Sequence, residues 1–384
     1  MGNIVDYVKK MGDTDFSEAP FSTVDALVLC EFCYLKFDGL VPDFKGQPVS
    51  LFDVEASENK EDLFQDKNYE KDNRKLYNAI LGSGRFNSMR IGHYVNRVDI
   101  EAESQFAAVT FFLPGDIVFV AFRGTDETMA GWQEDFALAL KKPILGQTLS
   151  AKYIDKVASL VKTPFMVGGH SKGGNLAMYA PMCARKLAKK NTSKIYIFDG
   201  PGFRPEAFKK EDYDLIKDKM VKIMPKSSPI GLLFNDPYEY QVIEAKSVGI
   251  LQHNPYNWVI KKGELVPAKM TEQHLLAMRS MNEWLLSLDD QGIEHFVSML
   301  CWILDATNAT TTIEFKENAA LHTRALIKAG QEADEKAKEM ASLFLKSYAE
   351  FAGEMIKEDI QKKFDLFLEE VNLIKDKVLP KKKK

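Results

Sequence analysis

The sequence is poor in the residues that build disulfide scaffolds and metal centres. Its 384 residues include only 4 cysteines and 6 histidines. A disulfide framework at this size would need more cysteines. Cys30 and Cys33 form a CxxC, but the pair lies inside the apolar segment "VDALVLCEFCYLKF" and no second CxxC follows. We therefore expect buried thiols at this pair rather than a zinc site, and no metal or organic cofactor elsewhere.

The chain also lacks a charge excess and long apolar runs. Lys and Arg number 51 and Asp and Glu 55, so the net charge is −4 and gives no electrostatic reason to expect nucleic acid as a partner. Because no run of about 18 apolar residues occurs, we expect no transmembrane segment. The start, "MGNIVDYVKKMGDTDF", has no apolar signal-peptide core, and Asp6 stands where myristoylation needs Ser or Thr. A cytoplasmic location is the default expectation.

Strand-like and helix-like segments alternate over the first three quarters of the chain. The β-rich runs lie at 106–113, 116–122, 164–169, 194–200, 220–225 and 240–245. Several of them are nearly continuous in apolar residues, which suits strands buried on both faces of a parallel sheet. Pro114-Gly115-Asp116 predicts a hairpin between the first two runs. Helical stretches lie at 130–141, 150–162 and 174–189. The alternation predicts an α/β fold with a mostly parallel sheet.

The last part of the chain has a different character. From Ile293 onward the sequence predicts a series of helices, because apolar residues recur at spacings of three and four. We expect two units, an α/β domain over residues 1–290 and a helical extension over 291–384. The extension either packs on the first unit or offers a surface to protein partners. The closing "PKKKK" is expected to be solvated, with a peripheral contact to an acidic membrane surface as the alternative.

One short segment carries the strongest chemical signal. In "FMVGGHSKGGNLAMYA", at 165–180, a strand-like run meets a helix-like run through Gly169-His170-Ser171-Lys172-Gly173. This fits G-x-S-x-G, in which a serine stands on a strained strand-to-helix turn and flanking glycines remove the clash with the strand and helix. The helix N-terminus also stabilises negative charge. The pattern predicts that Ser171 is a nucleophile, and the alternative is a glycine-rich turn without chemistry.

A serine nucleophile needs a base and an acid that orients the base. In α/β-hydrolases these follow the serine in the order acid, then histidine. Asp199 ends the next strand-like run, at the sheet edge where the elbow opens, although an aspartate there can also merely cap the turn. We favour His253, in the loop-like "LQHNPYNW", as the base, with His274 in a helical pattern as the alternative. His170 is expected to support the elbow.

The tetrahedral intermediate of acyl transfer also needs hydrogen-bond donors at its oxyanion. One donor is expected from the backbone N–H of the residue after the nucleophile, which is Lys172. The second is expected from a loop after an earlier strand. Arg123-Gly124-Thr125 follows the run at 116–122, and Thr125 offers both an N–H and a hydroxyl.

These segments resemble known lipases. "FRGTDETMAGWQEDF" is similar to the class 3 (fungal-type) lipase segment in which Arg-Gly-Ser/Thr precedes Trp and Asp, and "GGHSKGGNLAMYA" resembles the nucleophile elbow of that family. The resemblance implies an oxyanion role for Thr125 and a structural role for Trp132 and Asp135. About residues 2 to 290 look like a bacterial family of lipase-like α/β-hydrolases, filed as a domain of unknown function, that shares "IFDGPGF", "SSPIGLLF" and "QHNPYNW". The resemblance implies an α/β-hydrolase fold.

The sequence departs from the class 3 pattern at the acid. Those lipases place it on a later strand, and the corresponding stretch here, "MPKSSPIGLLF", has Ser227 and Ser228 instead. Asp199 resembles the acid of the pancreatic-lipase group, which follows the strand after the elbow. The acid has therefore moved one strand earlier, or the triad is incomplete. Alignment with class 3 lipases would favour a later histidine such as His274, whereas "QHNPYNW" is a hallmark of the bacterial family.

The sequence thus predicts a serine hydrolase of carboxylic esters, acting on small-molecule or lipidic substrates through Ser171, His253 and Asp199. Two alternatives stay open. The first is a catalytically inactive lipase-like fold that serves as a binding or scaffolding module. The second is a thioesterase or amidase with the same triad, since the nucleophile chemistry does not distinguish leaving groups.

Overall fold

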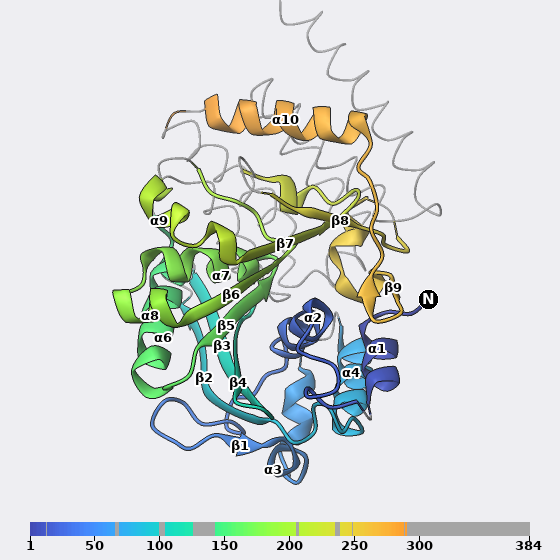
Figure 1. Ribbon diagram of the computed structural model, residues 1–384, viewed down its shortest axis with the longest axis vertical. Helices are drawn as coiled ribbons and strands as arrows, with labels where there is room; N and C mark the ends of the chain where they lie inside the picture. Colours follow the sequence, from blue (N-terminus) through green and yellow to red (C-terminus); the bar gives the residue numbers. More distant parts are fainter. Residues whose placement is uncertain are drawn as a thin grey trace, which may run out of the picture.

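A central sheet with helices on both faces dominates the molecule (Figure 1). The computed structural model describes residues 1–12, 14–65, 69–99, 104–125, 143–204, 207–234, 239–247, 249–287 and 289. Trp132, Asp135, the expected helix at 130–141 and the expected extension at 291–384 lie outside the described residues. Within the described ranges, the helices are all too short or too polar to cross a bilayer.

The sheet has eight strands, and their order in space follows their order in the sequence. They are β1 (Val49–Ser50), β2 (Arg90–Asp99), β3 (Ser104–Leu113), β4 (Ile117–Phe122), β5 (Phe165–His170), β6 (Thr192–Phe198), β7 (Met220–Pro225) and β8 (Gln241–Ile243). Strands β1 to β4 pair antiparallel, and β4 to β8 pair parallel. This is the expected α/β architecture. The expected hairpin joins β3 and β4, with Gly115 at φ 77° and Asp116 at φ 57°.

The helices and minor elements complete the described fold. The α-helices are α1 (Ile4–Met11), α2 (Thr23–Phe32), α3 (Leu51–Glu55), α4 (Glu70–Leu81), α6 (Leu145–Leu160), α7 (Lys172–Cys183), α8 (Lys186–Asn191), α9 (Lys210–Asp214) and α10 (Glu272–Ser287). Short 3₁₀ turns are η1 (Lys60–Phe64), η3 (Lys217–Lys219), η4 (Ile230–Leu232), η5 (Gly249–His253) and η6 (Pro255–Asn257), and a two-stranded ribbon pairs β9 (Ile260–Lys261) with β10 (Glu264–Leu265). The single helix expected at 174–189 is two helices, because Ala184 is extended at ψ 169°.

The winding of the sheet decides which helices cover which face. From β4 to β8 every parallel step goes in the same direction, and right-handed crossovers that all step one way put their helices on one face. Helices α6 and α7 accordingly pack against each other. The opposite face is covered by the N-terminal helix α2, which contacts β4, β5 and β6 (Figure 1).

Side chains of the parallel strands alternate between two hydrophobic cores. Val167, Ile195 and Ile197 are buried with α6 and α7, whereas Tyr196 and Phe198 are buried with α2 and the other N-terminal helices. Because both faces are covered, a strand can be apolar at nearly every position. This explains the continuous apolar runs seen in the sequence.

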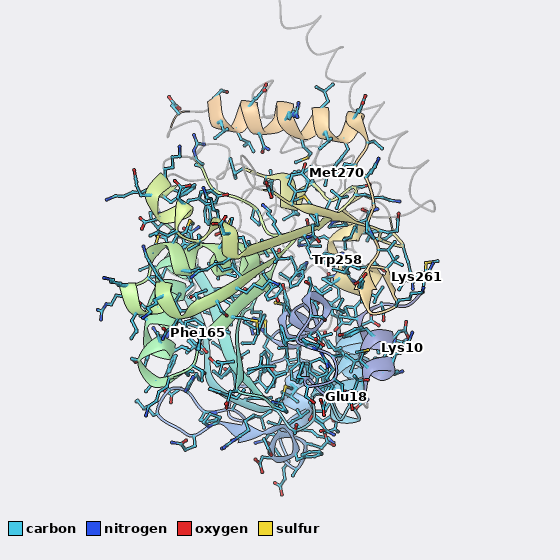
Figure 2. The ribbon with its side chains drawn as sticks, viewed as in Figure 1. Lys10, Glu18, Phe165, Trp258, Lys261 and Met270 are labelled. Atoms are coloured by element: carbon cyan, nitrogen blue, oxygen red, sulfur yellow. The ribbon has the colours of Figure 1, made fainter. Side chains whose placement is uncertain are left out.

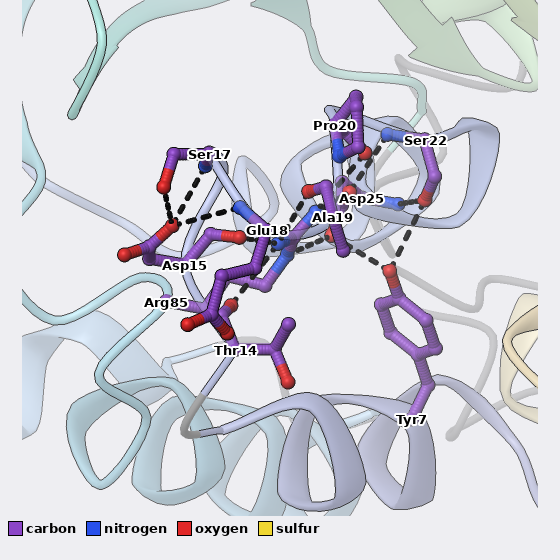
Figure 3. A network of polar contacts seen from close by, with 10 residues as sticks. All are labelled: Tyr7, Thr14, Asp15, Ser17, Glu18, Ala19, Pro20, Ser22, Asp25 and Arg85. Atoms are coloured by element: carbon purple, nitrogen blue, oxygen red, sulfur yellow. Dashed lines mark hydrogen bonds and ion pairs between the residues drawn. The ribbon is translucent and has the colours of Figure 1, made fainter.

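Helix α2 is fixed in place by a buried ion pair (Figure 3). Asp25 accepts two hydrogen bonds from the Arg85 guanidinium, at 2.9 and 2.6 Å, and one from the Tyr7 hydroxyl at 2.9 Å. Its carboxylate also accepts from the backbone N–H of Ser22, the N-cap of α2. Arg85 donates further to backbone carbonyls of the 14–20 segment. The pair therefore joins α1, the 14–20 segment, α2 and the Arg85 turn.

We predict that Asp25→Asn lowers the free energy of unfolding by roughly 3–5 kcal/mol, because it leaves the Arg85 charge buried without a counterion. Urea denaturation measures the loss. Asp53→Asn is the matched control, since Asp53 has the same position in the capping box of α3 but is exposed to solvent and expected to matter much less. Equal losses in the two variants would contradict the proposed importance of the buried pair.

Candidate active site

Ser171 stands at the junction between β5 and α7 in a strained backbone conformation. Its φ is 59° and its ψ is −129°, a region that non-glycine residues rarely occupy and that costs of order 1–3 kcal/mol. The strain is held by hydrogen bonds on both sides: the Ser171 N–H donates to the Phe198 carbonyl at 2.9 Å, and the Ser171 carbonyl accepts from Gly174 N at 2.9 Å. Ser171 itself is only half-buried.

The glycines that flank Ser171 are required by close packing. A Cβ on Gly169 would lie 2.2 Å from the carbonyl carbon of Gly173, and a Cβ on Gly173 would lie 2.1 Å from the Phe122 carbonyl oxygen. Any side chain at either position would push α7 away from β4 and β5. The G-x-S-x-G pattern therefore has a steric cause in this fold.

Asp199 is a fully buried carboxylate just past the end of β6, also at a positive φ of 47°. Its Oδ2 accepts hydrogen bonds from His253 Nδ1 at 2.6 Å and from the Ser228 hydroxyl at 2.5 Å. Its Oδ1 accepts from the Gly231 N–H at 3.1 Å. A Cβ on Gly231 would lie 2.4 Å from that oxygen, so only glycine allows this approach. Three donors thus surround the buried carboxylate.

His253 ends η5, and its side chain is 21% exposed. An ionised carboxylate only accepts hydrogen bonds, so the proton in the contact with Asp199 lies on His253 Nδ1. The neutral imidazole then carries its lone pair on Nε2, which is the atom that a general base uses. The structure therefore brings Asp199 and His253 together in the orientation that acid–base chemistry needs.

The expected site residues gather at one edge of the sheet. Thr125, Ser171 and Asp199 follow the carboxyl ends of the neighbouring parallel strands β4, β5 and β6. Gly124 lies against the elbow, since a Cβ on it would be 3.2 Å from the Ser171 Cβ. Lys172 is the first residue of α7, and its buried side chain runs to β3, where Nζ donates to the Gln105 carbonyl at 3.0 Å.

Of the two serines that stand where class 3 lipases have their acid, one contacts Asp199. Ser228 donates its hydroxyl to Asp199, and the Ser227 N–H donates to the side chain of Gln252 at 2.8 Å. His274, on α10, makes its contact elsewhere, with Nε2 3.2 Å from the Ser228 carbonyl. Of the two candidate bases, His253 is therefore the one on the carboxylate.

Of three buried ionisable groups with shifted pKa values, His170 was expected from the sequence, whereas Glu31 and Lys222 were not. Burial raises the pKa of Glu31, on α2, to about 8. Burial, with His253 as a lesser cause, holds the pKa of His170 well below its ordinary value. Burial also lowers the pKa of Lys222, on β7, to about 7, against the opposing charge of Asp199. An acid between Cys30 and Phe32, inside the apolar segment "VDALVLCEFCYLKF", was the signal that could have revealed Glu31.

Clusters of metal-binding side chains are a separate question for the part of the chain that the structure describes. No three of its His, Cys, Asp and Glu side chains cluster in a way that could hold a metal ion. Cys30 and Cys33 are free and buried, as expected for structural thiols. The site described above therefore consists of hydroxyl, imidazole and carboxylate groups.

Comparisons with other proteins add to this geometry. Residues 80–301 match a family model described as Mbeg1-like. The search of curated proteins found no match. Among solved structures, the chain is similar to one titled "Crystal structure of M37 lipase", at 14% identity and a TM-score of 0.39, with 70% of this chain and 80% of that chain covered. The stretch that matches the family model contains Ser171, Asp199 and His253.

We predict that Ser228→Ala lowers the free energy of unfolding by about 1–3 kcal/mol, because it removes a donor from a buried carboxylate. Chemical denaturation measures the effect. The matched control is Ser227→Ala, since the contact of Ser227 with Gln252 uses the backbone N–H and survives the substitution. The interpretation fails if the two variants lose the same stability.

We predict a pH-dependent effect of Glu31→Gln. Between the ordinary pKa of 4.5 and about 8, the folded protein holds a proton on Glu31 that the unfolded chain has released. Folding then takes up a proton, so this group lowers stability progressively as the pH rises through that window. The stability of the variant relative to the wild type should therefore increase from about pH 5 to about pH 8. Urea denaturation across this range measures it, and parallel curves would contradict it.

Proposed function

We propose that this chain, which belongs to the Mbeg1-like family of lipase-like proteins, is a serine hydrolase of carboxylic esters built on an α/β-hydrolase fold. The observation that supports it most is the 2.6 Å hydrogen bond between Asp199 and His253, at the sheet edge where Ser171 stands in a strained turn. We place the hydrolase domain at residues 1–290.

In the proposed reaction, Ser171 is the nucleophile and His253 the general base. The Ser171 Oγ attacks the ester carbonyl carbon while His253 Nε2 takes the hydroxyl proton. Asp199 keeps the imidazole oriented through Nδ1 and stabilises the imidazolium that forms. When the tetrahedral intermediate collapses, His253 returns the proton to the leaving alkoxide.

The oxyanion of the intermediate is assigned to Thr125 and the backbone N–H of Lys172. Thr125 follows β4, the strand beside the elbow, and Lys172 opens α7. A donor of this kind typically contributes about 3 kcal/mol to the barrier. The positive end of the α7 dipole favours the same negative charge.

The second half of the reaction releases the acid. Water attacks the acyl-enzyme with His253 as base, and Ser171 leaves with the proton that His253 returns. These steps call for no metal or organic cofactor. We propose lipidic or acylated small molecules as substrates. An inactive binding module and a thioesterase or amidase are the alternatives that the experiments below distinguish.

We predict that a fluorophosphonate probe labels the wild type but not Ser171→Ala. Turnover of a chain-length series of nitrophenyl esters should fall by roughly 10³-fold or more in Ser171→Ala and in His253→Ala, since these residues act as one unit. Asp199→Asn should fall by about 10⁴-fold, because the imidazole takes the wrong tautomer.

His274→Ala is the control, because its imidazole contacts the Ser228 carbonyl and not the carboxylate. It should keep most of the activity. A folded wild type that the probe does not label, or equal ester hydrolysis by all variants, would support the inactive module instead. Faster turnover of matched thioesters than of esters would identify a thioesterase.

A further inference from the structure

His170, the residue before the proposed nucleophile, reaches the main chain of the proposed base. Its side chain is buried, and Nε2 lies 2.8 Å from the carbonyl oxygen of His253. The two imidazole rings are 4.5 Å apart between centroids, at an angle of 35°. The contact links β5 to η5 across 83 residues of sequence. The residue before Ser171 is thereby joined directly to the proposed base.

The surroundings of His170 fix which of its nitrogens carries the proton. A carbonyl oxygen only accepts hydrogen bonds, so Nε2 must be the donor. Nδ1 faces the Tyr34 hydroxyl at 3.1 Å and Glu31 Oε1 at 3.4 Å, both from α2 or the turn after it. Burial keeps the His170 imidazole neutral, so Nδ1 accepts from the Tyr34 hydroxyl.

The residue before His253 in η5 is also fixed by hydrogen bonds. Trp258, fully buried and labelled in Figure 2, donates its indole N–H to the Gln252 carbonyl at 2.7 Å and lies edge-on to the His170 ring. The Gln252 side chain accepts from Ser227 N and donates to the Ser247 carbonyl at 2.7 Å. Successive carbonyls at 252 and 253 are therefore bound by two side chains from different parts of the chain.

We infer that His170 is a positioning residue: its Nε2–H holds the His253 main chain so that the His253 imidazole stays on Asp199 and presents Nε2 to the nucleophile. The inference rests on the proposed function for its catalytic consequence. Its structural part, the control of the His253–Asp199 contact by His170, stands independently of turnover. It assigns the selection of the His170 tautomer to the His253 carbonyl and the Tyr34 hydroxyl.

Two substitutions test whether the position of the His170 N–H donor matters, since both remove the imidazole ring. The side-chain amide of His170→Gln places an N–H near the position of Nε2, whereas that of His170→Asn places it near the position of Nδ1. We expect His170→Gln to keep kcat for ester hydrolysis within about fivefold, and His170→Asn to lower it by about 10–100-fold, since a misplacement of about 1 Å can cost that much. KM should change by less than about threefold, because the contact lies behind the reacting groups.

A spectroscopic measurement tests the inference without turnover. In protein with ¹⁵N-labelled histidine, the downfield Nδ1 proton that His253 shares with Asp199 should appear in the wild type and in His170→Gln. It should shift or vanish in His170→Asn. Histidine ¹⁵N shifts should also show His170 as the neutral Nε2–H tautomer. A wild type that is not labelled by the fluorophosphonate would end the proposed function but leave this test intact.

Thermal melting distinguishes positioning from simple packing. A merely structural role predicts that both variants lose melting temperature and kcat together, and that outcome would overturn the inference. So would a His170→Asn protein that keeps both wild-type kcat and the His253 proton signal.

If His170→Asn does not fold, Tyr34→Phe replaces it. This variant loses the Tyr34 hydroxyl that donates to His170 Nδ1, so more of the His170 imidazole should adopt the other tautomer and kcat should fall. The inference is also overturned if neither the His170 tautomer nor kcat changes.

Discussion

The buried carboxylate of Asp199 is the constraint on which the rest of the site depends. A fully buried anion is costly unless donors surround it, and this one receives a hydroxyl, a backbone N–H and an imidazole N–H. The donors come from two segments, since Ser228 and Gly231 lie in the turn after β7 and His253 ends η5, so both segments must approach the end of β6. The need to satisfy one charge thereby brings η4 and η5 against the sheet.

The groups around that anion are arranged to add little further charge. Burial favours the neutral forms of His170 and Glu31, and it lowers the pKa of Lys222 to about 7. An imidazolium that formed on His253 would therefore face Asp199 without a second cation in the neighbouring ring. The absence of a like charge in that ring favours the imidazolium that the proposed mechanism forms on His253.

The N-terminal helices contribute to the site through the winding of the sheet. Because the crossover helices α6 and α7 share one face, α2 must cover the other, and it brings Glu31 and Tyr34 beneath His170. The Asp25–Arg85 pair fixes the start of the same helix. Helix α2 and the turn after it thus carry both a structural ion pair and the proposed positioning network.

The sequence alone indicated the elbow and the parallel strands, because these depend on local patterns: glycines around Ser171 and apolar runs. It placed Asp199 at a strand end without deciding whether this acid pairs with a histidine. It left open the choice between His253 and His274 and the meaning of Ser227 and Ser228. Only the tertiary structure decided which imidazole lies on the carboxylate and that Ser228 donates to it. It also revealed the contact of His170 with His253. Such contacts join segments separated by tens of residues, and their register depends on how helices and loops pack, which no local pattern records.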